Sequence, residues 1–228
     1  MNIERQWKDQ LYQEFARIGK CLSSPKRLEL LDILAQGPKS VELLAKMTGM
    51  SVANVSQHLQ TLLESKLVRF HKKGNFVIYE IAELSVADFM VSLHRLSEKQ
   101  LSEIQRLKTD ILQVHKTMEP ISLEELMTRM DKGEVLLWDV RPQDEYEMGH
   151  IPGAISVPID ELEKYLAALP MNMEIVAYCR GPYCFMSAQA VEILQSKGIK
   201  ASRLEEGVHE WKRYAEHMNH STQGDARV

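Results

Sequence analysis

Two cysteines in the second half of the sequence have the types and spacing of a reactive thiol site. Cys179 follows the apolar run 175–178, and Cys184 ends the loop sequence Cys-Arg-Gly-Pro-Tyr-Cys. If a strand leads into this loop and a helix begins as it closes, backbone N–H groups and the positive helix end point at the sulfur, and Arg180 adds a cation. These groups lower the pKa of a thiol, and a thiolate can attack a sulfane sulfur or another soft electrophile. The alternative is a structural cysteine pair beside a turn.

The surroundings of this loop favour the reactive interpretation. Residues 139–141 read Asp-Val-Arg, residues 144–155 read Asp-Glu-Tyr-Glu-Met-Gly-His-Ile-Pro-Gly-Ala-Ile, and residues 204–211 read Leu-Glu-Glu-Gly-Val-His-Glu-Trp. Over about residues 120–217 the chain resembles the rhodanese family. The resemblance implies a small α/β domain whose loop cysteine, here Cys179, accepts sulfur as a persulfide. The residues that we expect to support the loop, rather than to act as acids or bases, are Asp139, Arg141, Glu145 and His150.

The loop departs from the family in two places. Many active rhodanese loops run Cys-Arg-x-Gly-x-Arg, whereas here Pro182 replaces the glycine and Cys184 replaces the arginine. The first change removes an N–H donor and the second removes a cation, which argues against turnover of thiosulfate. In exchange the loop gains a second thiol. We expect Cys184 to attack or to accept a persulfide sulfur from Cys179, giving a disulfide or a relayed sulfur, and a disulfide requires Cα atoms within roughly 7 Å.

A second group of polar residues, in the first half, has the character of a helix that reads DNA. After Ser51, apolar residues recur at helical spacing, and off that stripe lie hydroxyl, amide and imidazole groups that can bond base edges. The residues predicted to face DNA bases are Ser51, Asn54, Ser56, Gln57, His58 and Thr61. Those predicted to meet phosphates are Lys26, Arg27, Lys72 and Lys73. The alternative is a solvated helix face and an ordinary polar turn.

The elements around this group predict a winged helix-turn-helix. Helices are expected over 7–22, from Pro25 to Gly37, over 41–47 and after Ser51, followed by strands 67–71 and 76–80 around a basic turn. Over about 85–116 neither Gly nor Pro occurs, which predicts one long helix. Its apolar stripe exceeds what a small domain can cover, so we expect a second copy of the chain to cover it in a homodimer.

The segments 23–31, 51–59 and 67–68 resemble the ArsR/SmtB family of winged-helix repressors, over about residues 5–115. The resemblance implies a homodimer, paired through its first and last helices, that binds a near-palindromic operator and leaves it when an inducer binds. Metal sensors of the family carry a cysteine pair where residues 39–44 here have none, and Asp88, His94, Glu98 and His115 do not repeat the spacing of zinc ligands. We therefore expect no metal site and no cofactor, and we expect Cys21 to be a small buried hydrophobic residue.

Beyond Pro120 the pattern changes to alternating helices and strands, which predicts a parallel α/β sheet. Helices are expected over 122–130, 160–169, 185–197 and 208–217, and strands over 135–140, 174–178 and 200–203, with a loop-rich stretch up to Pro158. The fold class is thus a multidomain α+β chain with a mostly α winged helix followed by an α/β rhodanese-like domain. The predicted boundaries are 1–118 for DNA binding and dimerisation, 119–220 for the rhodanese-like domain and 221–228 for a frayed tail.

Composition narrows the class of protein. The 228 residues contain no apolar run near the roughly 18 residues that span a bilayer, so we expect no membrane association. Three cysteines and a polar start without a signal-peptide pattern favour a reducing cytoplasm. Residues 1–118 carry 17 Lys and Arg against 13 Asp and Glu, a net charge of +4. The remaining residues have a net charge of −8, which gives the chain its total of −4. Only the first half is therefore suited to a polyanion.

Three functions are compatible with these patterns. The favoured one is a sequence-specific DNA-binding regulator, a repressor by preference, whose rhodanese-like domain senses or processes reactive sulfur. Its partners would be a double-stranded operator, a second copy of the chain, and a sulfane-sulfur donor or similar thiophilic molecule. The alternative is a sulfurtransferase acting through Cys179, with the winged helix serving for dimerisation or localisation. In the third, the rhodanese-like domain is an inert docking module.

Overall fold

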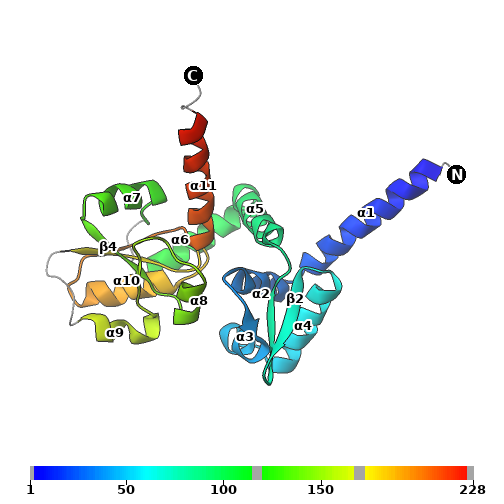
Figure 1. Cartoon of the computed structure of the whole chain (residues 1–228), viewed down its shortest axis with the longest axis horizontal. Coiled ribbons are helices and arrows are strands. Elements are labelled where there is room, and N and C mark those ends of the chain that lie inside the picture. Colours follow the sequence, from blue (N-terminus) through cyan, green and yellow to red (C-terminus); the bar gives the residue numbers. More distant parts are fainter. Residues whose placement is uncertain (1–2, 115–119, 167–172, 225–228) are drawn as a thin grey trace. The chain divides into compact units, whose positions relative to one another are not determined.

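The computed structural model describes residues 3–114, 120–166 and 173–224 (Figure 1). The chain divides into two compact units, residues 1–101 and 102–228. The predicted domain boundary at residue 118 lies outside the described residues, as does His115.

The first unit is a winged helix-turn-helix, as predicted. Its elements are α1 (Ile3–Leu22), α2 (Pro25–Ala35), β1 (Lys39–Ser40), α3 (Val41–Thr48), α4 (Val52–Glu64), β2 (Val68–Lys73), β3 (Phe76–Ile81) and α5 (Leu84–Gln100). Ser40 and Ser51 cap α3 and α4, since their hydroxyls accept hydrogen bonds from the backbone N–H groups of Leu43 and Asn54. Gly49 ends α3 with a φ of 66°, a conformation that favours glycine.

The wing is a three-stranded antiparallel sheet in the order β1-β3-β2. Strand β1 was not predicted, because two residues next to a helix cap carry no strand periodicity of their own. Lys73 pairs with Phe76, so the turn contains only Gly74 and Asn75, and Lys72 and Lys73 belong to the end of β2. Leu30, Leu44 and Leu62, from α2, α3 and α4, are fully buried in the core beneath this sheet.

The single helix predicted over about 85–116 is wrong, because the structure has two helices, α5 and α6 (Ser102–Val114). Leu101 lies between them in an extended conformation, with φ −115° and ψ 101°. The local signal is a new helix start: Ser102 opens α6, and the acidic Glu103 in its first turn favours a helix N-terminus. Helical periodicity does not reveal a break that involves neither Gly nor Pro.

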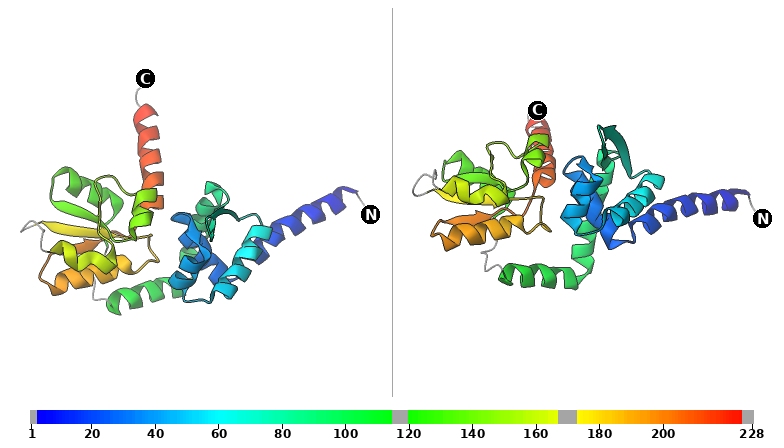
Figure 2. Two further views of the ribbon diagram at one scale, coloured as in Figure 1. Left: turned by 60° about the horizontal axis from the view of Figure 1, so that its bottom comes forward. Right: turned by 90° about the horizontal axis from the view of Figure 1, so that it is seen from below.

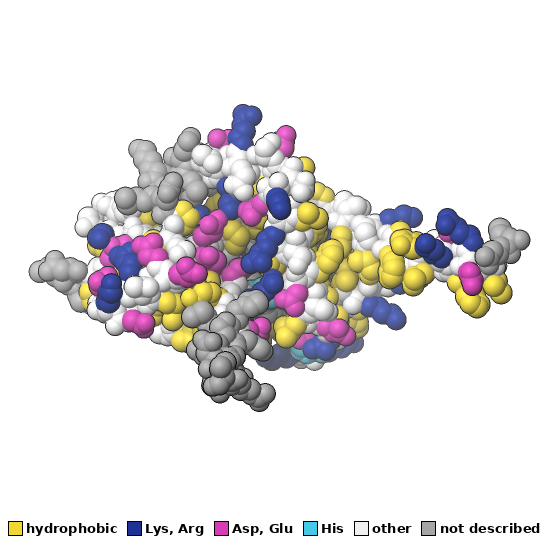
Figure 3. Space-filling model, turned by 90° about the horizontal axis from the view of Figure 1, so that it is seen from above, with side chains coloured by type: hydrophobic (Ala, Val, Ile, Leu, Met, Phe, Trp, Pro, Cys, Tyr) yellow, Lys and Arg dark blue, Asp and Glu magenta, His cyan; other side chains and the backbone are white. Residues whose placement is uncertain are grey.

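The first helix, α1, carries an apolar stripe that is not covered by other described residues. Trp7, Leu11 and Phe15 are each more than half exposed. Figure 3 shows apolar side chains gathered along this helix. An uncovered stripe of this size on a helix surface is typical of an interaction surface.

The second unit is an α/β fold with a four-stranded parallel sheet in the order β5-β4-β6-β7. After α6, its elements are α7 (Leu123–Asp131), β4 (Val135–Asp139), α8 (Gln143–Met148), β5 (Ile155–Ser156), η1 (Ile159–Glu161), α9 (Leu162–Tyr165), β6 (Glu174–Tyr178), α10 (Met186–Ser196), β7 (Ala201–Arg203) and α11 (Val208–Gly224). Helix α8 and strand β5 occupy part of the stretch predicted as loop. Helix α11 continues beyond the predicted end at residue 217, since neither Gly nor Pro occurs in it before Gly224.

Two cores lie on opposite faces of this sheet, and β6 contributes to both (Figure 2). Val176 and Tyr178 pack with residues of α7 and α11. Ile175, Ala177 and Cys179 pack on the other face with residues of α9 and α10. The strand alternation therefore places Cys179 on the α10 face of the sheet.

Glu174 ties β6 and β7 to α7 at the end of the sheet opposite Cys179. Its carboxylate accepts hydrogen bonds from Arg129 (2.6 Å) and from the Ser202 hydroxyl (2.5 Å), and it forms an ion pair with Lys200 (2.6 Å). Burial opposes ionisation of Glu174, but these three partners outweigh it and lower the pKa to about 2.

Because the folded-state pKa lies below that of the unfolded chain, Glu174 stabilises the fold above the unfolded pKa and loses this contribution as the pH falls toward 2. We expect Glu174→Gln to lower the free energy of unfolding by about 1–3 kcal/mol at pH 7, and the difference to shrink steadily below pH 4. Urea unfolding followed by tryptophan fluorescence measures this. The exposed Glu163→Gln is the matched control, and an equal effect of both variants at pH 7 would contradict the assignment.

Candidate functional site: a cysteine loop and a DNA-reading helix

The cysteine loop connects β6 to α10 and spans residues 179–185. Cys179 is buried at its base, where the thiol lies 3.0 Å from the carbonyl oxygen of Cys184 and 3.3 Å from the hydroxyl of Ser187. Cys184 is partly exposed, and both cysteines are free thiols. The Cys184 N–H donates to the carbonyl of Gly181, which closes the loop just before α10 begins. The predicted strand, loop and helix are therefore confirmed.

The charge of the thiol pair does not lie where the sequence predicts it. Burial raises the pKa of Cys179, and the neighbouring Cys184 raises it further. The hydrogen bond from Cys179 lowers the pKa of Cys184 to about 6, helped by the charge of Arg180 and by the backbone N–H groups of Arg180 and Met186. The prediction of a lowered pKa at Cys179 is therefore wrong. Of the two thiols, Cys184 is therefore the one that ionises more readily, because the bond from Cys179, the charge of Arg180 and two backbone N–H groups all favour its thiolate.

Arg180 points to α8, where it forms an ion pair with the fully buried Glu145. Its Nε donates to one carboxylate oxygen at 2.9 Å and its Nη2 to the other at 2.8 Å. This two-pronged geometry fixes the guanidinium plane. Arg180 thus acts on Cys184 through its charge and its backbone N–H, while its side chain anchors the loop.

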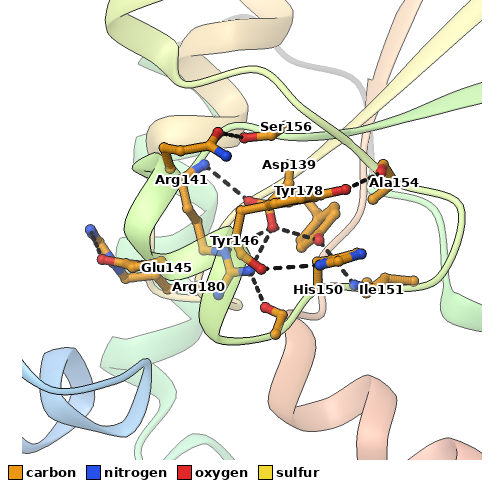
Figure 4. A network of polar contacts seen from close by, with 12 residues as sticks. Asp139, Arg141, Glu145, Tyr146, His150, Ile151, Ala154, Ser156, Tyr178 and Arg180 are labelled. Carbon is orange, nitrogen blue, oxygen red and sulfur yellow. Dashed lines mark hydrogen bonds and ion pairs between the residues drawn. The ribbon is translucent and has the colours of Figure 1, made fainter.

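Asp139 and Arg141, predicted as supporting residues, form the centre of a buried network (Figure 4). The Nε of Arg141 donates to Asp139 at 2.9 Å, and its Nη2 donates to the carbonyl of Gly149 at 2.8 Å. The Tyr178 hydroxyl donates to Asp139 at 2.6 Å and accepts from the N–H of Ile151 at 3.1 Å. Burial, reinforced by Asp139, raises the pKa of Tyr178, so it stays neutral. The network joins β4 to the residue that precedes Cys179.

Sequence reasoning missed Tyr178. The available signal was a polar hydroxyl within an apolar strand, directly before the cysteine. His150, by contrast, lies in the predicted supporting segment: its Nδ1 is 3.0 Å from the carbonyl oxygen of Tyr146, and the two rings stack with centroids 3.8 Å apart. Tyr146 also donates to the carbonyl of Ala154. These contacts hold the 146–154 segment next to the network.

The turn between β7 and α11 packs directly on the cysteine loop. A Cβ at Gly207 would lie 2.7 Å from the carbonyl carbon of Arg180, so only glycine fits there without displacing the loop backbone. Helix α6 contacts the same region, because Lys108 forms an ion pair with Glu205 at 2.7 Å and its ammonium lies 5.8 Å from the ring centre of Tyr183. Sequence reasoning did not find these contacts, since no local pattern relates residues so far apart.

Helix α4, which the sequence predicts to read DNA, presents most of its predicted residues to solvent. Ser51, Asn54, Ser56 and Gln57 are exposed, while His58 and Thr61 are half-buried. The hydroxyls of Ser51, Ser56 and Thr61 make hydrogen bonds to the helix backbone. Across the described part of the chain, the side-chain amides of Asn54 and Gln57 make no hydrogen bond to the helix backbone. Asn54 and Gln57 are therefore best placed to bond a base edge.

The predicted phosphate contacts differ in how they are engaged. Lys72 and Lys73 are exposed at the end of β2. Lys26 forms an ion pair with Glu29 at 2.8 Å, and Arg27 donates to the carbonyls of Lys20 and Cys21 at the end of α1. Lys72 and Lys73 thus remain the more accessible cations, whereas Arg27 serves to cap α1.

The remaining candidates of the first unit have structural surroundings. Cys21 is buried in the core, as predicted, with its thiol 3.7 Å from the carbonyl of Thr61. His94 lies 3.4 Å from Asp32. Within the described ranges, no three His, Cys, Asp or Glu side chains are grouped to hold a metal ion. No helix there has both the length and the apolar character needed to cross a membrane.

The assignment of the thiolate is testable by the pH dependence of alkylation. We expect Cys184 to react with iodoacetamide with a midpoint near pH 6, while Cys179 stays unreacted until well above neutral pH. Peptide mass spectrometry resolves the two sites, and buried Cys21 provides the control within the same chain. Preferential alkylation of Cys179 at pH 7 would show that the charge is assigned to the wrong cysteine.

Comparison with known proteins identifies both units. A family model described as "Rhodanese-like domain" matches residues 122–214, and one described as "Bacterial regulatory protein, arsR family" matches residues 24–69. The HTH-type transcriptional regulator Rv0324 of Mycobacterium tuberculosis is 41% identical over 202 residues, covering 89% of this chain and 88% of that protein.

Two further relatives each match one unit. The human thiosulfate:glutathione sulfurtransferase is 31% identical over 104 residues, 40% of this chain and 90% of that protein. The solution structure of the homodimeric winged helix-turn-helix DNA-binding domain of Mb0332 from Mycobacterium bovis is 36% identical. The match covers 41% of this chain and 87% of the Mb0332 domain, with a TM-score of 0.40. On the full-length relative and the two domain matches together, the chain belongs to the ArsR-family HTH-type transcriptional regulators that carry a C-terminal rhodanese-like domain.

Proposed function

We propose that this regulator is a sulfur-responsive repressor: it binds an operator as a homodimer and releases it when sulfane sulfur modifies the cysteine loop. The observation that carries the proposal is the thiol pair itself. Cys179 and Cys184 lie within one short loop; Cys179 is buried and its pKa is raised, while Cys184 is partly exposed and its pKa is lowered. Such a pair is suited to a reversible redox reaction rather than to packing.

The first unit supplies the DNA-binding part of the proposal. The exposed amides of Asn54 and Gln57 lie near the start of α4, and Lys72 and Lys73 extend from the wing. The N-terminal residues of a recognition helix are those that contact base edges, and wing lysines are suited to phosphates. The exposed stripe of Trp7, Leu11 and Phe15 supports a homodimer, because burial in a two-fold interface would remove this apolar surface from water.

The chemistry begins at Cys184. Its thiolate attacks the outer sulfur of a persulfide donor, the donor S–S bond breaks, and the donor leaves as a thiolate with the electron pair. Cys179 then gives its proton to the departing thiolate. Attack of Cys179 on the Sγ of Cys184 forms a disulfide and releases hydrosulfide, whereas attack on the outer sulfur moves the persulfide to Cys179 and restores the Cys184 thiolate.

The contacts of α6 supply a route from the loop toward the first unit. Tyr183 lies between the two cysteines in sequence and faces Lys108, which also holds Glu205. A change of loop conformation on sulfur modification alters these contacts, and α6 follows directly on Leu101 and α5. The proposal therefore makes α6 the element whose equilibrium the loop biases.

The DNA-binding step is tested first. Operator sequences are selected by the full-length protein from a random DNA pool, and affinity is then measured against salt concentration. We expect affinity to fall steeply with salt and Gln57→Ala to weaken binding about tenfold, since a lost bidentate base contact costs 1–3 kcal/mol.

Gln60→Ala is the matched control on the same helix, because the Gln60 amide is bonded to Glu64 at 3.2 Å. We expect it to bind as the wild type does. Equal losses in both variants, or affinity that does not change with salt, would argue against α4 as the reading helix.

The sulfur response is tested with inorganic polysulfide on the protein–operator complex. We expect polysulfide to weaken wild-type binding at least tenfold and to leave the Cys184→Ser complex intact, since the attacking thiolate is gone. Lys108→Gln should take up sulfur normally by mass spectrometry yet release DNA less. Cys21→Ala, a change in the core of the first unit, should respond as the wild type does.

The alternative enzyme function makes a different prediction with the same protein. If the protein turns over thiosulfate or polysulfide many times and sulfur leaves its operator affinity unchanged, the protein is a sulfurtransferase attached to a DNA-binding unit rather than a sensor. The sensor would also be refuted if polysulfide released DNA from a variant that lacks both Cys179 and Cys184 as fully as from the wild type.

A further inference from the structure

Arg203 is a charged side chain on the same face of the sheet as Cys179. In the parallel pairing of β6 and β7, Ala201 lies opposite Ile175 and Arg203 lies opposite Ala177. Side chains two residues apart point to the same face of a strand, so Ala177, Cys179 and Arg203 share the face covered by α10. The apolar members of this face, including Ala177 and Ala201, form the core there. Arg203 therefore places a cation at the edge of an apolar core, next to the base of the cysteine loop.

This guanidinium is buried without a full set of partners. Arg203 is 2% exposed, and within the described part of the chain its buried Nε has no hydrogen-bond partner. A buried and unsatisfied donor on a charged group is costly, and natural proteins rarely keep one without a reason. Burial lowers the pKa of Arg203, while Glu205 and both loop cysteines act in the opposite direction.

Two other arginines of this unit, the buried Arg141 and the partly buried Arg180, have hydrogen-bond partners. Arg141 bonds Asp139, and Arg180 makes three hydrogen bonds to Glu145. Among the charged groups that face the loop, Arg180 is thus occupied by Glu145, and Glu205 is paired with Lys108. Arg203 is the buried cation on the Cys179 face whose Nε still lacks an acceptor.

We propose that Arg203 is the counter-ion of the anionic sulfur formed on Cys179, first as the thiolate and then as the persulfide. The inference rests on the proposed sulfur chemistry, and it supplies what that chemistry lacks. A thiol at the base of an apolar core cannot ionise without a nearby positive charge. Once Cys184 has taken up sulfur, its thiolate has been consumed, and the next anion required is the Cys179 thiolate that completes the reaction, which Arg203 stabilises.

The test measures ionisation of Cys179 directly. In full-length protein with Cys184→Ser, the thiolate absorbance of Cys179 is titrated against pH, using Cys179→Ser/Cys184→Ser as the blank. We expect Arg203→Met to raise the midpoint by about one pH unit and Arg203→Lys, which keeps the charge, to restore most of the shift. At a pH below both midpoints, alkylation of Cys179 should slow about tenfold in Arg203→Met.

Arg129→Gln is the matched control, since it removes a cation from the same unit at the Glu174 end of the sheet. It should not move the midpoint. If folded Arg203→Met titrates as its parent does, or if Arg129→Gln shifts the midpoint equally, the inference is overturned. Methionine is chosen because an apolar side chain of similar length fits a buried site, and Arg203→Lys gives a second comparison if Arg203→Met does not fold.

The readout is independent of DNA. A shifted midpoint in a protein whose operator binding ignores polysulfide would keep Arg203 as the counter-ion and refute the sensor. If polysulfide releases the operator normally but Arg203→Met does not move the Cys179 midpoint, the sensor is kept and the role of Arg203 is refuted.

Discussion

The bond between the Tyr178 hydroxyl and Asp139 is the contact on which the geometry of the second unit depends. It joins the ends of two neighbouring parallel strands at 2.6 Å, in an interior where an unpaired carboxylate would be severely destabilising. Arg141 balances the charge and extends the network to the carbonyl of Gly149. Since Cys179 is the next residue after Tyr178, the position of its sulfur is set by this buried network rather than by the loop alone.

Charge compensation then explains the division of roles around the loop. Each arginine around the loop has a defined partner: Asp139 for Arg141, Glu145 for Arg180, and on our proposal the sulfur of Cys179 for Arg203. The first two pairs are permanent and hold the scaffold. The proposed pair of Arg203 with the Cys179 sulfur exists only when Cys179 is ionised. On this proposal the reaction supplies the partner that Arg203 lacks in the resting protein. Preorganised charge of this kind lowers the free energy of a developing anion without further rearrangement.

Local signals in the sequence were sufficient for much of the fold. The apolar run 175–178 and the serine before α4 predicted a strand and a helix start that the structure confirms, because strand propensity and capping act over a few residues. Burial and partners at long range were not accessible in this way. Which cysteine carries the charge depends on how deeply each sulfur lies, and the place of Arg203 depends on the register of β7 against β6. Helical periodicity also could not predict the break at Leu101 or the uncovered face of α1. It shows that a helix is amphipathic but not what covers its apolar face.

The extended Leu101 has a consequence for how such a regulator can be tuned. An unbroken helix would transmit rotation as a rigid rod, whereas one extended residue introduces two torsions between α5 and α6. If the loop controls DNA binding as we propose, the stiffness of this joint sets the gain of the response, separately from the thiol chemistry and from the choice of operator. Sequence changes at a single position could adjust sensitivity over generations while the sulfur site and the recognition helix both stay constant.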